Sequence, residues 1–153
     1  MTVESPASLR DRVLQVLQRE IDAILAPAGY VRIGGSWSRT TAFARTEVAI
    51  QRSQSGLACY INLARFQRLF GREWVPPGSV YSGWRVGHFT DSVAEANGLD
   101  ALPYAELDGD SPLRRRVTTL LSERVVPFLG RCHGLLGHRQ LPPRVAALRK
   151  GTA

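Results

Sequence analysis

The sequence has few of the features that mark specialised classes of protein. Its 153 residues include only two cysteines, Cys59 and Cys132, which are too few for a disulfide framework. We therefore expect reduced, buried thiols and a cytoplasmic location. No apolar run approaches the roughly 18–20 residues of a membrane span, and the first residues do not resemble a signal peptide. The sequence predicts no membrane association.

Motifs of the common catalytic sites are also missing. The chain has no glycine-rich phosphate loop, no G-x-S-x-G and no H-E-x-x-H. We therefore predict no cofactor and lean away from an enzyme. With 44% hydrophobic and 22% charged residues, the composition is that of a globular protein. We expect a single domain over residues 1–140, followed by a loose basic tail over 141–153.

The net charge of +7 is distributed unevenly. Glu123 is the last acidic residue, and six of the 20 basic residues follow it, so the first 123 residues carry a net charge of only +1. Lys150 is the only lysine among the basic residues. We attribute the excess of arginine to a compositional bias of the source genome; the alternative is bidentate binding of phosphate or carboxylate by guanidinium groups.

Hydrophobic spacing divides the chain into helical ends and a stranded middle. Apolar residues recur every three or four positions from Leu9 to Leu25, which predicts a helix starting at Ser5-Pro6 or at Ser8. Alternation with a period of two follows from Tyr30 to about Phe66. A last helix is predicted from Ser111, with a kink or a break at Pro127.

These elements together define the expected fold. We predict the α+β class, with an antiparallel four- to five-stranded meander packed by the N-terminal helix and the kinked C-terminal helix. A further strand is expected over residues 80–89.

Uncharged polar residues on the central strands form the first candidate site. Gln51 and Ser53 share one face of their strand, and Tyr60 and Asn62 share one face of the next. Pairing of the two strands would gather them into a recognition surface, which Arg32 or Arg39 could join. An ordinary solvated sheet face is the alternative.

The second candidate is a segment in which arginines alternate with aromatic residues. The spacing of Arg65, Arg68 and Arg72 favours one side of a short helix, which Pro76-Pro77-Gly78 would end. Together with Trp74 they are candidates for binding a partner. Arginines can contact phosphate and aromatic rings can stack on bases, whereas exposure of Phe70 and Trp74 would favour a protein partner. Alternatively, the aromatic residues of this segment join the core.

Two further clusters contain side chains of the kinds that bind metals or act in catalysis. Glu106, Asp108 and Asp110 could hold Mg²⁺ or Ca²⁺, but we expect them to compensate the arginines at 114–116 beside a helix N-terminus. The other cluster contains Cys132, His133 and His138. The five-residue spacing of its histidines suits a shared metal poorly, and a thiol on an apolar stripe is usually inert. We predict no metal and no catalytic residue.

Short motifs along the chain resemble one uncharacterised bacterial family. They are Gly29-Tyr30 after the first helix, Gln51-Arg52-Ser53, Tyr60-Ile61-Asn62-Leu63, Arg85-Val86-Gly87, and the closing helix region Pro112–Gly137. Together they resemble domain of unknown function 4304. Ala64 stands where that family has glycine, and Phe66–Pro77 has no counterpart. The resemblance implies an α+β fold, and some relatives look like immunity proteins beside bacterial toxin systems.

The leading functional hypothesis is a non-enzymatic cytoplasmic binding module that occludes a protein partner and is immunity- or antitoxin-like. The alternative is sequence-independent binding of nucleic acid through the basic C-terminal segment. Its candidate residues are Arg131, Arg139, Arg144, Arg149 and Lys150.

Overall fold

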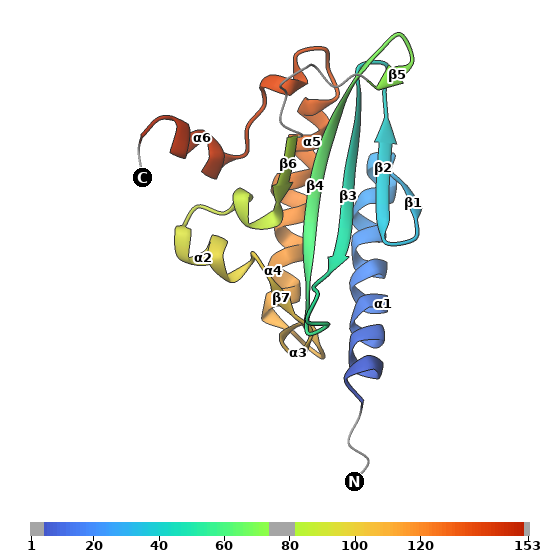
Figure 1. Ribbon diagram of the computed structural model, residues 1–153, viewed down its shortest axis with the longest axis vertical. Coiled ribbons are helices and arrows are strands. Elements are labelled where there is room, and N and C mark those ends of the chain that lie inside the picture. The colour runs from blue at the N-terminus through green and yellow to red at the C-terminus, as the bar shows by residue number, and fades with distance from the viewer. Residues whose placement is uncertain (1–4, 74–81, 152–153) are drawn as a thin grey trace.

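The computed structural model describes residues 5–73 and 82–151 (Figure 1). Helix α1 (Pro6–Leu25) begins as the first of the two predicted starts, because the Ser5 hydroxyl accepts a hydrogen bond from the Ser8 N–H and Pro6 occupies the first turn. A 3₁₀ turn, η1 (Ala26–Ala28), follows, and Gly29 ends it with a φ of 87°. Only a residue that tolerates the left-handed region can end the helix in this way.

Four strands form the predicted antiparallel meander. They are β1 (Val31–Ile33), β2 (Ser36–Thr40), β3 (Ala44–Arg52) and β4 (Ala58–Leu69). Three short strands, β5 (Arg72–Glu73), β6 (Ser82–Arg85) and β7 (Leu102–Pro103), also pair with β4. Asn62 pairs with Ala49 of β3 and with Arg85 of β6, so β6 lies on the edge of β4 opposite β3.

The long C-terminal helix is interrupted where the sequence predicts it. Its parts are α4 (Pro112–Leu120), a π turn η3 (Leu121–Val125) and α5 (Val126–Cys132). Ser111 accepts the Arg114 N–H at 3.0 Å and so caps α4. Pro127 has no N–H to donate, and the wider turn immediately before it, in which the Val126 N–H bonds the Leu121 carbonyl, accommodates that loss.

The core lies between one face of the sheet and the two long helices. Figure 1 shows α1 and the α4–α5 helix side by side on the same side of the sheet. Leu17 and Ile21 of α1 are fully buried there, as are Ile61 of β4 and Leu120 and Phe128 of the C-terminal helix. This arrangement confirms the α+β class and the packing of the meander by its N- and C-terminal helices.

Short helices complete the chain. They are η2 (Val86–Phe89), α2 (Val93–Gly98), α3 (Tyr104–Leu107), η4 (Gly137–Arg139) and α6 (Pro143–Arg149). The expected strand over residues 80–89 is therefore shorter than predicted, because the chain turns into η2 after Arg85. No helix in the described ranges is long and apolar enough to cross a membrane.

Two predictions about local structure are wrong. Residues 64–69 continue β4 instead of forming a helix, because Arg65 and Gln67 find strand partners at Thr46 and Ala44. Residues beyond 141 are not a loose tail throughout: α6 forms there, and its Val145 packs against the core.

Candidate functional site

The two faces of the sheet have opposite chemistry. Val48 and Ile61 point inward and are buried, while their neighbours Glu47, Asn62 and Tyr60 point to the other side, because successive side chains alternate along a strand. In Figure 1 no helix covers this other side across β2, β3 and β4. We call it the outer face.

The structure brings three of the four predicted polar residues together on the outer face. The Asn62 amide Nδ2 donates to Gln51 Oε1 at 2.6 Å, and Tyr60 lies opposite Gln51 across the strand pair. Ser53 lies apart from them in the β3–β4 turn. Its hydroxyl accepts the Ala58 N–H at 3.2 Å, which makes it part of the turn.

A residue that the sequence analysis did not assign to this face completes the cluster. Arg85 enters from β6, and its guanidinium lies over the Tyr60 ring at 4.4 Å from the centroid. It also forms an ion pair with Asp100 at 2.6 Å. Arg32 and Arg39, which were expected as companions, pair with the inward-facing Trp37 and Thr46 and so belong to the inner face.

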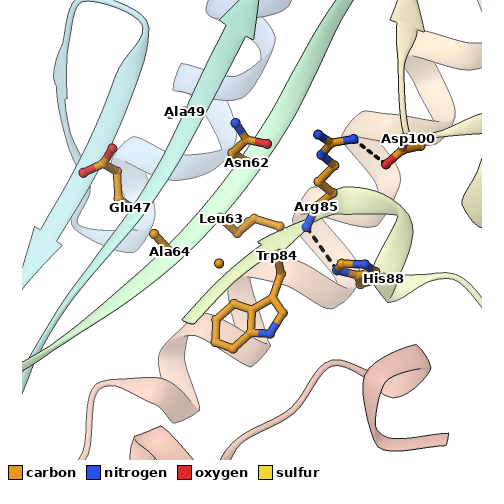
Figure 2. A pocket seen from close by; sticks show the side chains of 10 residues that line it. Glu47, Ala49, Asn62, Leu63, Ala64, Trp84, Arg85, His88 and Asp100 are labelled. Atoms are coloured by element: carbon orange, nitrogen blue, oxygen red, sulfur yellow. Dashed lines mark hydrogen bonds and ion pairs between the residues drawn. The ribbon is translucent and has the colours of Figure 1, made fainter. Parts of the chain in front are cut away.

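A hollow of about 480 Å³ lies on the outer face beside Arg85 (Figure 2). Its floor is low because Ala49, Ala64 and Gly83 carry small side chains or none. Its walls hold the polar groups of Glu47, Asn62, Arg85, His88 and Asp100, and Leu63 and Trp84 complete the lining. Concave sites with a few oriented polar groups are the usual form of a binding pocket.

Hydrogen bonding fixes the polar groups of the hollow. The Arg85 backbone N–H donates to His88 Nδ1 at 3.2 Å, so the neutral ring carries its proton on Nε2. Burial lowers the pKa of His88 and outweighs the opposing effect of Asp100, while Arg85 acts in the same direction as burial. The lowered pKa favours this neutral ring. Glu47 is paired with Arg45 at 2.5 Å. The hollow therefore combines two ion pairs with a neutral imidazole.

The predicted Arg65–Trp74 segment does not form one binding surface. Arg65 points inward and is 5% exposed. Its Nε donates to the Cys132 carbonyl at 2.8 Å and its Nη2 to the Gly134 carbonyl at 3.4 Å, so it fastens the end of α5 to the sheet. Arg68 and Arg72 lie in the β4–β5 hairpin, and Trp74 lies outside the described residues.

A buried polar cluster surrounds His133 on the inner face. Thr46 Oγ1 is 2.6 Å from His133 Nε2 and 2.7 Å from the Tyr30 hydroxyl. Burial lowers the pKa of His133 to about 4, with Arg39 and Arg65 acting in the same direction. The ring is therefore neutral at pH 7. The sequence predicts neither a metal-binding nor a catalytic role for His133, and its inward contacts are those of a structural residue.

The two cysteines and the acidic cluster also take part in burial or ion pairing within the fold. Burial raises the pKa of Cys59 to about 12 and of Cys132 to about 11, so both remain thiols. Asp108 forms an ion pair with Arg12 at 2.8 Å, and Asp110 pairs with Arg115. Within residues 5–73 and 82–151 no group of three or more His, Cys, Asp or Glu side chains could hold a metal ion.

The basic C-terminal residues are spread over three elements. The Arg131 guanidinium of α5 lies 5.8 Å from the Phe128 ring centroid, and Arg139 ends η4. Arg144 lies in α6 and Lys150 follows it. The side chain of Arg149 lies outside the described part of the chain.

Comparison with known proteins identifies no relative of this chain. No family model, no curated protein and no solved structure matches this chain. The geometry of the outer face is therefore the basis for a functional proposal.

Proposed function

We propose that the protein is a non-enzymatic binding module that occludes a protein partner with the outer face of its sheet. The observation that carries the proposal is the hollow on this uncovered face. A side chain of a partner can fill it, and the ion pairs at its walls can orient that side chain.

The surface around the hollow also suits a protein partner. One cross-strand row runs from Ile33 through Ser36, Ala49 and Asn62 to Arg85. Its β1 end is apolar, with Ile33 78% exposed, and its β6 end is polar and charged. A surface that combines exposed apolar side chains with a polar rim is typical of protein interfaces.

The resemblance to domain of unknown function 4304 supports a more specific version of this role. We propose that the module is immunity- or antitoxin-like and acts in a bacterial cytoplasm. Occlusion needs no catalytic group, and the thiols of Cys59 and Cys132 are kept protonated by burial.

Filling the hollow tests the proposal. Purified wild-type chain and an Ala49→Phe variant are immobilised and offered extract of the source cells, with and without nuclease treatment, at low and high salt. We expect a salt-resistant protein to be retained by the wild type and lost with Ala49→Phe. Leu57→Phe, a change at an exposed site in the β3–β4 turn region, is the matched control and should retain it. Retention by Ala49→Phe would contradict the proposal.

Nucleic-acid binding through the C-terminal segment is the second candidate. Arg131, Arg139, Arg144 and Lys150 form no ion pair with a described carboxylate, whereas Arg124, just before them in sequence, is paired with Asp91. Unpaired cations are available for phosphate. If the extract yields only nuclease-sensitive material that salt removes, and deletion of residues 139–153 abolishes its retention, this candidate replaces the first.

A further inference from the structure

The β4–β5 hairpin carries an unusual residue in its turn. Leu69 pairs with Arg72, so Phe70 and Gly71 are the only turn residues. Their φ angles are 51° and 76°. Two positive φ values in a two-residue hairpin are those of a type I′ turn, for which Asn-Gly is the favoured sequence. A bulky residue in this region of φ is strained.

Phe70 contributes nothing to the folded core in return. Its side chain is fully exposed, so its burial stabilises nothing, and its backbone conformation costs free energy. Strain of this kind persists where it serves a function. An exposed aromatic ring on a rigid turn is well suited to enter a pocket on another molecule.

The charges beside Phe70 indicate the chemistry of that pocket. The Arg68 guanidinium donates to the Gly71 carbonyl within the turn at 3.1 Å, its one side-chain hydrogen bond to a described residue, and Arg72 is exposed. Neither forms an ion pair with a carboxylate of the described residues. The carboxylate of the hairpin, Glu73, is already paired with Arg45. Two arginines that pair with no carboxylate in the described part of the chain therefore flank the ring.

We propose that Phe70 is the anchor by which the module holds its partner: it enters an apolar pocket on a protein whose rim carries carboxylates that meet Arg68 and Arg72. The inference rests on the proposed function, because it gives the chemistry of the same partner. The hairpin adjoins the outer face, since Glu73 pairs with Arg45 of β3, whose guanidinium lies 3.8 Å from the centroid of the Phe66 ring on that face.

The geometry favours a protein over the other partners that arginine and phenylalanine can bind. Single-stranded nucleic acid is held by aromatic rings along a basic groove. Here the Phe66 ring is already covered by Arg45. The ion-pair partner of Arg45 is Glu47, which places a negative charge on the same face. Insertion into a lipid surface needs a broad apolar face. One protruding ring between two arginines matches the aromatic and arginine anchors of protein interfaces.

The first test separates binding from folding. Phe70→Asn creates the favoured Asn-Gly turn, so we expect its thermal midpoint to equal or exceed that of the wild type. A lower midpoint would show that Phe70 supports the fold and would overturn the proposal. Leu57→Asn is the control for exchanging an exposed apolar side chain for asparagine. Leu57 is 65% exposed and lies near the opposite end of β4.

The second test identifies what Phe70 touches. The photo-crosslinking analogue p-benzoylphenylalanine replaces Phe70, or Leu57 in the control, and the source cells are irradiated. We expect a protein adduct from position 70 only. The adduct should be lost when Arg68→Glu and Arg72→Glu are combined, and kept with Arg19→Glu, a reversal of an exposed charge on α1. Adducts only with nucleic acid, lipid or a second copy of this chain, or no adduct, would overturn the inference.

The crosslinked protein is then purified and its affinity measured. We expect Phe70→Asn to weaken binding about 30-fold or more, as loss of a central aromatic anchor does, and Leu57→Asn to leave it unchanged. If Ala49→Phe abolishes binding while Phe70→Asn does not, the anchor is refuted and the binding role of the outer face stands. If neither variant affects binding, both proposals fail.

Discussion

Arg65 on the inner face of the sheet and Arg85 on the outer face have opposite surroundings. On the inner face, Arg65 is buried and donates to the main-chain carbonyls of Cys132 and Gly134. On the outer face, Arg85 remains partly exposed and is held by the side chains of Tyr60 and Asp100. The inner contacts join sheet to helix, whereas the outer ones hold a partly exposed charged group beside the hollow. Stability should therefore depend on the inner face and binding on the outer face.

The largest effect on stability should come from Arg65. Arg65→Ala leaves the carbonyl of the buried Cys132 without this donor, and a buried polar group that loses its partner is costly. The Gly134 carbonyl is less affected, because it also accepts the Gly137 N–H at 3.0 Å. We expect the free energy of unfolding to fall by about 3 kcal/mol, measured by urea denaturation.

The matched control is Arg68→Ala, on the same strand with its side chain in the β4–β5 hairpin. Its contact is a single hydrogen bond within the turn, so we expect a loss of about 1 kcal/mol or less. Equal losses for the two variants would contradict the division of roles between the two faces.

The next largest change in stability should appear when the pH is lowered. The pKa of His133 lies at about 4 in the folded protein, and near 6.5 in an unfolded chain. Between these values the unfolded state binds the additional proton, so stability should decrease as the pH falls from about 6.5 to about 4. The loss should reach up to about 3 kcal/mol.

His133→Gln tests this assignment, since it removes the titrating ring and keeps a polar group near Thr46. Urea denaturation of the variant at several pH values should show a smaller decrease over the same window. Because His88 also has a lowered pKa, part of the decrease in stability with falling pH should remain in this variant. Asp91 and Asp108, whose pKa values are lowered by their arginine partners, act below their ordinary value of 3.8. An unchanged slope would show that His133 is not the group involved.

Much of the fold could be predicted because its signals are local. The Ser5-Pro6 and Ser111-Pro112 starts, the alternation through β3 and β4 and the interruption near Pro127 each depend on neighbouring residues. The continuation of β4 was missed because Arg65 occupies an inward position, where the alternation predicts an apolar residue. Without that signal, the three- and four-residue spacing of the arginines suggested a helix.

The candidate site could be predicted only in part, because half of it comes from distant segments. Gln51, Tyr60 and Asn62 belong to one hairpin, so their alternation was sufficient to place them together. Arg85 reaches them by pairing β6 with the far edge of β4, and Asp100 follows from a later segment. No local pattern specifies which edge a short strand will join. The hollow depends on that pairing as well.

The smallest effect on stability should come from the outer face. Asn62→Ala removes the hydrogen bond to Gln51 in an exposed position, where water replaces it. We expect a loss of about 0.5 kcal/mol, and Gln51→Ala should cost about the same. The double variant should cost less than the sum of the two, because both single changes remove the same bond. If Asn62→Ala instead costs as much as a buried contact, the outer face stabilises the fold as the inner face does. The hollow would then be a by-product of packing. A small loss of stability, combined with weaker retention of the captured partner, would show that Asn62 is kept on this face for binding.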